Sequence, residues 1–305
     1  MTDAPIIYWH ADDYGMTECS DRRIEACRDH LCSVSIVPNG DAAGAVRRAL
    51  AGGLIVSLHI NLVEGKALTD AHEIPLLARA DGSFCNSFGG LLKLSLSGKR
   101  SEFARQLELE LRSQLRAFAN LLPNGTPLRL DSHQHVHMIP LVYRTLMQAV
   151  EAEGLNVQYM RIPAEPMRPF VHSVGLWRTY SAINVVKQIV LKGCWLLIKP
   201  DFKRRGIETA VFCGILFSGH MDDKRLARVL PELKRIAIKR EQALEVLFHP
   251  GGIKPGEPLF DPQKPDFAAF YHSPGREIEG RALCTLGKNT AHERRERYNG
   301  ECKQR

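Results

Sequence analysis

The chain has 305 residues, of which 44% are hydrophobic and 25% are charged, as in an ordinary soluble globular protein. This length suffices for one large α/β domain or two small domains. The eight cysteines are dispersed and form no C-x-x-C pair, which excludes a zinc knuckle or a disulfide framework of the usual spacing. There is no apolar run of the ~20 residues needed to span a bilayer and no signal peptide before residues 6–9. We therefore expect a cytoplasmic protein without a transmembrane segment.

The net charge of +7 raises the question of a polyanionic partner, such as nucleic acid or anionic lipid. Residues 288–305 hold six Lys/Arg against three Glu, so this segment contributes +3 and the rest of the chain +4. A charge of +4 spread over a large domain gives little support for such a partner. We expect no nucleic-acid binding, and we interpret residues 287–305 as a polar, disordered tail.

Short apolar segments alternate with amphipathic segments about seven times along residues 1–286. Strands are predicted at residues 6–9, 33–37, 54–62, 127–130, 157–163, 208–217 and 243–248. Strands that alternate with helices form right-handed βαβ units and a parallel sheet. We therefore predict an α/β fold with a single catalytic domain, a TIM-like (βα) barrel that is distorted and seven-stranded. A doubly wound sheet is the alternative, but the sequence contains no G-x-G-x-x-G or P-loop to support it.

Three further segments lead to specific expectations. Residues 103–122 predict an amphipathic helix, because apolar side chains recur every three or four positions. Residues 63–100 are rich in Gly, Pro, Ser and Asp and predict an irregular excursion over the site, a lid. Residues 183–198 are the most apolar helix candidate and lead into the basic residues 199–205. We interpret this helix as a buried one with a basic end, although an interfacial membrane helix has the same pattern.

The densest group of chemically active side chains follows the predicted strand at residues 127–130. If the strand continues, Asp131, His133, His135 and His137 alternate with their neighbours and point to one face. Three imidazoles and a carboxylate that converge at a strand end favour a divalent metal. The alternative is a His-rich turn whose side chains are satisfied by hydrogen bonds.

Polar side chains also lie at the ends of three other predicted strands: Asp12 and Asp13 come after the first, His59 lies near the end of the third, and His249 follows the last. Taken singly, the Asp pair could cap a helix, and a lone His on an apolar strand is more often a core residue. In a parallel barrel, however, the carboxyl ends of all strands share one rim, where active sites are built. This shared location favours one site that includes His133.

Four motifs in chain order carry a family resemblance. Residues 10–15 (HADDYG) resemble the N-A-D-D-[FY]-G opening of the YdjC-like carbohydrate deacetylases. Residues 58–62 (LHINL) resemble their [GS]-L-H-x-N-L segment, and residues 131–137 (DSHQHVH) their D-S-H-x-H-x-H segment. Residues 248–251 (FHPG) resemble their late H-P-G. Residues 163–222 and the tail lie outside this resemblance.

The resemblance implies a TIM-like barrel and removal of an N-acetyl group from an amino sugar. By position, Asp13, His59 and His133 would hold the metal, and Asp12 would be the general base. One carboxylate and two imidazoles leave coordination positions open for water and substrate, as a hydrolytic metal needs. His10 stands where the family has Asn, a difference that changes hydrogen bonding around the metal ligands.

Five other side chains receive roles around this site. The leaving amine needs a proton, and we assign the acid to His249. His135 and His137 are the alternatives, either as proton donors or in orienting the substrate. We expect Asp131 to orient an imidazole, and Arg161, near the mouth of its strand, to contact substrate or the groups around the metal.

Two imidazoles and one carboxylate suit zinc, iron(II) or manganese, and the resemblance adds magnesium. We expect one divalent ion, Mg²⁺ or Zn²⁺, and an N-acetylated sugar as substrate. The apolar-then-basic residues 183–205 add the hypothesis of peripheral membrane contact with a lipid-linked substrate. A homo-oligomer, a dimer, is expected without support from any pattern. The alternative functions are a metal-dependent barrel hydrolase of another bond, such as a phosphoester, and a catalytically silent sugar-binding module.

Overall fold

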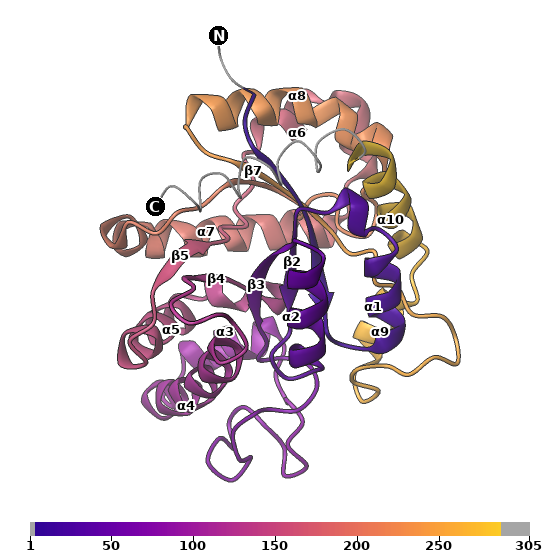
Figure 1. The fold of residues 1–305 in the computed structure, drawn as a ribbon. Coiled ribbons are helices and arrows are strands. Elements are labelled where there is room, and N and C mark those ends of the chain that lie inside the picture. The colour runs from indigo at the N-terminus through magenta and orange to yellow at the C-terminus, as the bar shows by residue number, and fades with distance from the viewer. Residues whose placement is uncertain (1–3, 288–305) are drawn as a thin grey trace.

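The computed structural model describes residues 4–287 (Figure 1). Within this range seven parallel strands form one sheet in the order β5-β4-β3-β2-β1-β7-β6. The strands are β1 (Ile7–Tyr14), β2 (Ser33–Ile36), β3 (Ile55–Ile60), β4 (Leu128–Ser132), β5 (Val157–Met160), β6 (Val211–Cys213) and β7 (Leu244–Phe248). The predicted strand at residues 208–217 is therefore much shorter than expected.

The two edge strands of this sheet approach each other through Glu208, which precedes β6. The Glu208 N–H donates to the Gln158 carbonyl, and the Met160 N–H donates to the Glu208 carbonyl, both at 3.0 Å. These two bonds join β5 to the segment that leads into β6, so the sheet curls round into a TIM-like barrel. The predicted fold class, a distorted barrel of seven strands, is confirmed.

Helices follow the strands and surround the sheet (Figure 1). The main helices are α1 (Glu18–Glu25), α2 (Ala42–Ala51), α3 (Phe88–Ser95), α4 (Arg100–Ala119), α5 (Pro140–Ala152), α7 (Ala182–Arg205), α8 (Asp223–Lys239) and α10 (Gly275–Leu286). The shorter elements are η1 (Arg28–His30), η2 (His133–Met138), α6 (Arg168–His172), η3 (Val174–Thr179) and α9 (Pro265–Tyr271). None of the helices in the described residues is both long and apolar enough to cross a membrane.

The helix predicted at residues 103–122 is α4, and its apolar stripe is buried. Phe103, Leu107 and Leu111 are fully enclosed, as are the equivalent positions of the next two turns. The predicted irregular excursion, residues 63–100, contains the helix α3 and packs on α4. Glu110 of α4 accepts hydrogen bonds from the Leu68 and Thr69 N–H groups, at 3.1 and 2.8 Å. The excursion therefore lies beside α4.

The interpretation of residues 183–198 as a buried helix is wrong. One side of α7 packs on the barrel through Leu191 and Ile198. The opposite side is equally apolar but faces solvent, with Ile183 exposed by 72% and Leu197 by 71%. Apolar residues at 11 of these 16 positions made the helix look buried, whereas a helix on the outside of a barrel has only one side that faces the protein.

The inside of the barrel is unusually polar. Arg129 of β4 lies over the ring of Tyr159 of β5, with its guanidinium carbon 3.9 Å from the ring centroid. The Tyr159 hydroxyl donates to Glu245 of β7. Polar groups buried together in this way must bind one another, and these three side chains connect β4 and β5 with β7 inside the barrel.

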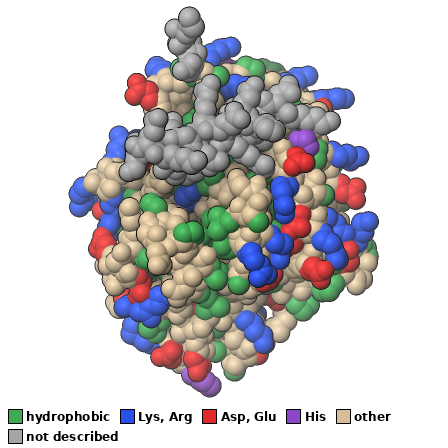
Figure 2. Space-filling model, in the orientation of Figure 1, with side chains coloured by type: hydrophobic (Ala, Val, Ile, Leu, Met, Phe, Trp, Pro, Cys, Tyr) green, Lys and Arg blue, Asp and Glu red, His purple; other side chains and the backbone are tan. Residues whose placement is uncertain are grey.

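On the face shown in Figure 2, basic and acidic side chains are interspersed. No large area of one charge sign occupies the described part of that face. The predicted disordered tail, residues 287–305, lies outside the described residues except for Gly287.

Candidate metal centre and active site

Two adjacent aspartates at the end of β1 reach the same site, although neighbours on a regular strand point to opposite faces. The register between β1 and β2 shifts between Ala11 and Tyr14. Within that break Asp13 has φ 69°, a left-handed conformation that Asp tolerates better than most residues. The irregularity turns the Asp13 side chain toward the rim that Asp12 already faces. Both carboxylates are buried.

His59 of β3 and Asp131 of β4 are register partners in adjacent parallel strands. Register partners point to the same face of a sheet, and the His59 Nδ1 lies 2.5 Å from the Asp131 Oδ1. The other ring nitrogen, Nε2, is thereby aimed at Asp13, whose Oδ1 is 3.4 Å away. Asp131 therefore orients the His59 imidazole, as expected of a carboxylate beside a metal-binding histidine.

The expectation that Asp131, His133, His135 and His137 point to one face is wrong. Strand β4 ends at Ser132, where its pairing with β3 also ends. Left-handed backbone at Gln134 (φ 51°) and His135 (φ 60°) then turns the chain into η2.

The three histidines of this turn separate in direction. His133 remains beside Asp13, and His135 lines the pocket described below. The two ring nitrogens of His137 instead lie 2.6 Å from the Ser132 hydroxyl and 2.8 Å from the Arg161 carbonyl. His137 is buried beneath the rim and makes both of these contacts, so its role is structural.

Asp13, His59 and His133 form a compact group whose potential ligand atoms all lie within 4.8 Å of one another. The Asp13 Oδ1 is 3.4 Å from the His59 Nε2 and 3.0 Å from the His133 Nδ1. Two ligands of a tetrahedral zinc ion, each about 2.0–2.1 Å from the metal, are about 3.3–3.4 Å apart. The spacing and the donor set therefore fit one divalent cation.

The charge balance of the buried groups also favours a bound cation. Five buried carboxylates surround the rim, belonging to Asp12, Asp13, Glu64, Asp131 and Glu245. Arg161 is the buried arginine among them. This excess of negative charge attracts a cation.

The two histidines respond to that negative charge. Burial opposes a charge on His59, but Asp12 and Asp131 outweigh it and raise the His59 pKa to about 10. Burial likewise opposes a charge on His133, and Asp13 raises its pKa to about 9. A cation held between these imidazoles would supply the positive charge that their protons otherwise supply.

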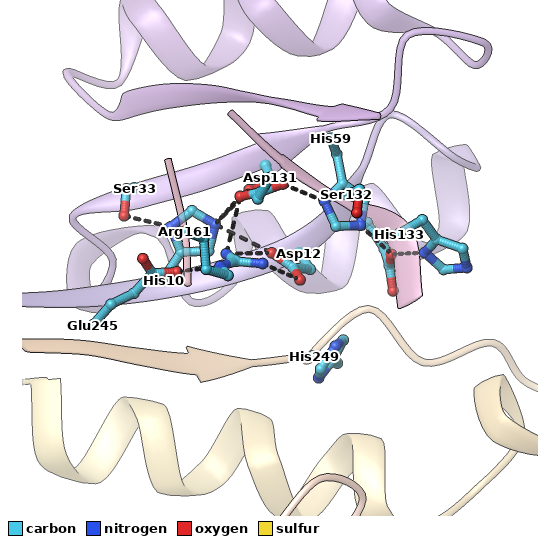
Figure 3. A network of polar contacts seen from close by, with 12 residues as sticks. His10, Asp12, Ser33, His59, Asp131, Ser132, His133, Arg161, Glu245 and His249 are labelled. Carbon is cyan, nitrogen blue, oxygen red and sulfur yellow. Dashed lines mark hydrogen bonds and ion pairs between the residues drawn. The ribbon is translucent and has the colours of Figure 1, made fainter. Parts of the chain in front are cut away.

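A second acidic group, formed by His10, Asp12 and Asp131, also has its polar atoms within 4.8 Å. Here Arg161 takes the place of a cation. Its guanidinium bonds both Asp12 oxygens at 2.8 and 2.9 Å, approaches Asp131 at 3.1 Å and donates to Glu245 at 2.6 Å (Figure 3). Burial opposes ionisation of Asp12, but Arg161 outweighs it and holds the Asp12 pKa well below its usual range. Asp12 is therefore a fixed carboxylate.

His10, which replaces the family's Asn, bonds two serines of the neighbouring strand. Its Nδ1 is 2.6 Å from the Ser33 hydroxyl, and its Nε2 is 2.7 Å from the Ser35 hydroxyl and 3.2 Å from Asp12. Ser35 in turn donates to Asp131. The imidazole thus links β1 to β2 and supports Asp12 and Asp131, two of the three carboxylates that Arg161 binds.

The sequence analysis did not single out Glu64. Its Oε2 lies 3.0 Å from the His133 Nε2 and accepts a hydrogen bond of 3.0 Å from the Tyr271 hydroxyl. Its Oε1 is buried without a hydrogen-bond partner among the described residues. Burial raises the Glu64 pKa above its ordinary value. The available signal in the sequence was position, because Glu64 follows His59 by five residues, in the segment just after the same strand.

A pocket of about 190 Å³ opens over the cluster. Its lining includes Asp12, Asp13, His59, His133, His135 and His249, with Lys187 from α7 and with Asp266, Phe267 and Phe270 from α9. The α9 wall was not predicted, because residues 250–275 lack a clear period. An enclosed space with aromatic walls beside acidic and basic groups is typical of a site for a small polar ligand.

His249 lies at the end of β7, apart from the hydrogen-bonded network (Figure 3). Its Nδ1 is 3.3 Å from Glu279 of α10, and its backbone N–H donates to the same carboxylate at 2.7 Å. Burial opposes ionisation of Glu279, but Arg276 and His249 outweigh it and lower its pKa to about 2. The ionised Glu279 therefore orients His249, which reaches the pocket from the side opposite the Asp131 network.

The fold and this rim place the protein in the class of TIM-like α/β barrels with a candidate metal centre at the strand ends. Within that class the chain belongs to the YdjC-like protein family, whose sequence profile matches residues 7–286. The family resemblance carried by the four motifs is thereby confirmed.

Curated relatives have consistent names. The carbohydrate deacetylase of Mus musculus is 31% identical over 250 residues, which cover 79% of this chain and 76% of that protein. The carbohydrate deacetylase of Homo sapiens is 28% identical, with coverage of 79% and 73%. The chitooligosaccharide deacetylase of Escherichia fergusonii is 32% identical over 159 residues, 50% of this chain and 58% of that protein.

One solved structure shares the fold over nearly the whole chain. It is an Enterococcus faecalis protein named a "putative cellobiose-phosphate cleavage protein". The two structures superpose with a TM-score of 0.62 at 15% identity and cover 96% and 95% of the two chains. This likeness shows the barrel and carries no information about the reaction.

Proposed function

We propose that this protein is a metal-dependent hydrolase that removes the N-acetyl group from an N-acetylated amino sugar. The observation that carries the proposal is the Asp13–His59–His133 group, with the carboxylate of Asp12 on the wall of the same pocket. The names of the curated relatives support the carbohydrate and the bond. We propose Mg²⁺ or Zn²⁺ as the ion, because the donor set combines oxygen with imidazole nitrogen.

Asp13, His59 and His133 would hold the ion, which when bound polarises an amide carbonyl and lowers the pKa of water. Asp12 accepts the proton of the attacking water. Its low pKa keeps it ionised, and Arg161 holds it in one orientation by two parallel hydrogen bonds. A strongly paired carboxylate is a weak base, so the water must already be acidified for Asp12 to act.

The departing amine must gain a proton before the C–N bond breaks to leave acetate and the free amino sugar. We assign this step to His249, because Glu279 binds its Nδ1 side and leaves Nε2 for the pocket. His135 is the alternative donor, but burial lowers its pKa well below the ordinary value and favours its neutral form. A neutral imidazole at neutral pH is a poor acid, so His249 is preferred.

The alternative of a two-metal phosphoesterase is disfavoured by Arg161. A second metal about 3.5–4 Å from the first needs its own carboxylates. Of the carboxylates next to the first site, Asp12 and Asp131 are already bound to the guanidinium, which leaves Glu64 as a single candidate ligand.

A reducing compartment suits the cysteines, and we propose the cytoplasm. The seven described cysteines are all free, including Cys27 and Cys284, whose sulfur atoms lie 3.6 Å apart. Reduced thiols at that distance persist where the surroundings keep them reduced.

The test is acetate release from a panel of N-acetylated sugars, with added Mg²⁺ or Zn²⁺ and after chelation. We expect release only with metal. Asp12→Asn should lower kcat by about 10²–10⁴-fold while the protein still binds one metal ion per chain, measured by elemental analysis. His59→Ala should lose both metal and activity. Metal-independent acetate release, or an Asp12→Asn variant with full activity, would contradict the proposal.

A further inference from the structure

The largest exposed apolar surface of the described chain lies on α7 and the segment just before it. Of the 13 exposed large hydrophobic side chains among the described residues, eight fall between Val171 and Leu197. They are Val171, Val174, Trp177, Ile183, Val186, Ile189, Leu196 and Leu197. These eight side chains fall within 27 consecutive residues, and such a concentration marks an interaction surface, whereas isolated exposed apolar residues are ordinary.

The α7 members of this group form one stripe. Ile183, Val186 and Ile189 recur every three residues, and Leu196 and Leu197 continue the same face two turns later. Exposure of these five side chains ranges from 59% for Val186 to 72% for Ile183. The opposite face is fixed to the barrel, where the Asn184 amide donates to the Ser218 carbonyl at 3.0 Å. The stripe is therefore a rigid part of the fold.

The charges along the stripe itself are basic. Residues 171–200 contain four Lys/Arg and no Asp or Glu. Further along, α7 ends in Lys203, Arg204 and Arg205, and the last two pair with Asp201 of the same helix. An apolar helical face flanked by basic side chains is complementary to the acyl chains and anionic headgroups of a lipid surface. Trp177, 54% exposed, is of the residue type enriched at membrane interfaces.

The stripe adjoins the pocket. Lys187, one residue after Val186, lines the pocket, as do Gly214, Ile215 and Ser218 of the segment that α7 covers. A surface that docks on α7 therefore lies at the pocket mouth. A second copy of the chain would bring Lys187, Lys192 and Lys199 of one stripe toward the same lysines of the other, and like charges oppose this contact. A bilayer with anionic lipid would attract these lysines.

We propose that the exposed face of α7, with η3, docks on an anionic lipid bilayer and presents the pocket to N-acetylated amino sugars carried by membrane lipids. The docking part is independent of the reaction. The substrate part rests on the proposed deacetylation.

The docking test is co-sedimentation of the full chain with phosphatidylcholine vesicles, with and without phosphatidylglycerol. We expect binding to the anionic vesicles that weakens as salt is added. The double variant Leu196→Gln/Leu197→Gln should weaken binding roughly tenfold or more, because two apolar side chains leave the membrane. Lys199→Gln and Lys203→Gln should each weaken it roughly fivefold on anionic vesicles only.

The matched control is Leu96→Gln at the end of α3, which is 81% exposed and outside the stripe; it should bind as the unchanged protein does. Protein that stays in the supernatant with both vesicle types would overturn the docking proposal. So would a solution dimer, seen by ultracentrifugation, that Leu196→Gln/Leu197→Gln dissociates without any vesicle binding.

The substrate test compares acetate release from an N-acetylglucosaminyl lipid in anionic vesicles with release from a soluble N-acetylated sugar. The Leu196→Gln/Leu197→Gln variant should lose activity on the lipid by roughly tenfold and keep activity on the soluble sugar. Equal losses on both, or none on the lipid, would refute the substrate part. Vesicle binding with no acetate release from either compound would instead refute the proposed reaction and leave the docking surface intact.

Discussion

Arg161 is the single positive charge that three buried carboxylates share, so its removal should destabilise the protein strongly. Arg161→Met keeps most of the side-chain volume but leaves Asp12, Asp131 and Glu245 without their common partner. All four groups are buried. Removing one partner of a buried ion pair costs about 3–5 kcal/mol, a large part of the roughly 5–15 kcal/mol by which a domain is stable.

The pH dependence identifies the cause. With Arg161 present, the pKa of Asp12 and of Asp131 lies below the ordinary value. Their contribution to stability is therefore present above the unfolded pKa and is lost only as pH falls through the folded pKa. In Arg161→Met, burial is opposed only by the neighbouring histidines, His10 and His59 at Asp12 and His59 at Asp131, so the pKa of both carboxylates rises. Proton uptake by the folded variant should then recover stability as pH falls from 8 toward 5.

The measurement is the free energy of unfolding in urea at pH 8 and pH 5, with chelator present so that metal does not contribute. We expect a deficit of about 3–5 kcal/mol at pH 8 that shrinks at pH 5. Arg168→Met is the matched control, because Arg168 pairs with Glu232 at the surface and should cost less than about 1 kcal/mol. A loss of unfolding free energy below about 1 kcal/mol for Arg161→Met, or a loss that is the same at both pH values, would refute the reasoning.

Three further predictions concern single side chains. Burial raises the Glu165 pKa to about 7. The contribution of Glu165 to the free energy of unfolding is therefore full below pH ~4.5, and about 3 kcal/mol is lost as pH rises through 7. Glu165→Gln should flatten the dependence of the free energy of unfolding on pH in this range, and an unchanged slope would contradict this. His249→Gln should lower kcat by about 10²-fold with metal content unchanged, whereas full activity at every pH would exclude His249 as the acid. Glu64→Gln should weaken metal binding by about 10–100-fold in calorimetry, and unaltered affinity would show that Glu64 does not support His133.

The positions of the principal site residues were predictable because strand ends are local features. Asp12, Asp13, His59 and His133 each follow an apolar run, and a parallel barrel brings the ends of such runs together. The register of β3 and β4 then pairs His59 with Asp131. What the pattern could not show was the backbone at these points. Alternation predicted one face for the whole His-rich segment, but β4 ends where β3 ends, and left-handed residues turn the chain.

Glu245 shows how a partner across the barrel escapes a sequence pattern. It is the lone charge in a fully buried strand, which indicates that some buried group must bind it. That group is Arg161, 84 positions earlier in the chain. Their meeting depends on the curl that brings β5 round toward β6 and β7, and a local periodicity carries no information about such closure.

The sequence by itself determined the alternation of strands and helices and the chemical groups at the strand ends, because both follow from side-chain spacing of two and of about 3.6 residues. Only the tertiary structure decided which of those groups meet. It bound Asp12 to Arg161, placed Glu64 against His133 and turned His137 away from the pocket. It also left one face of α7 in solvent. The physical reason is that burial and pairing are set by neighbours distant in sequence, which the closure of the barrel brings together.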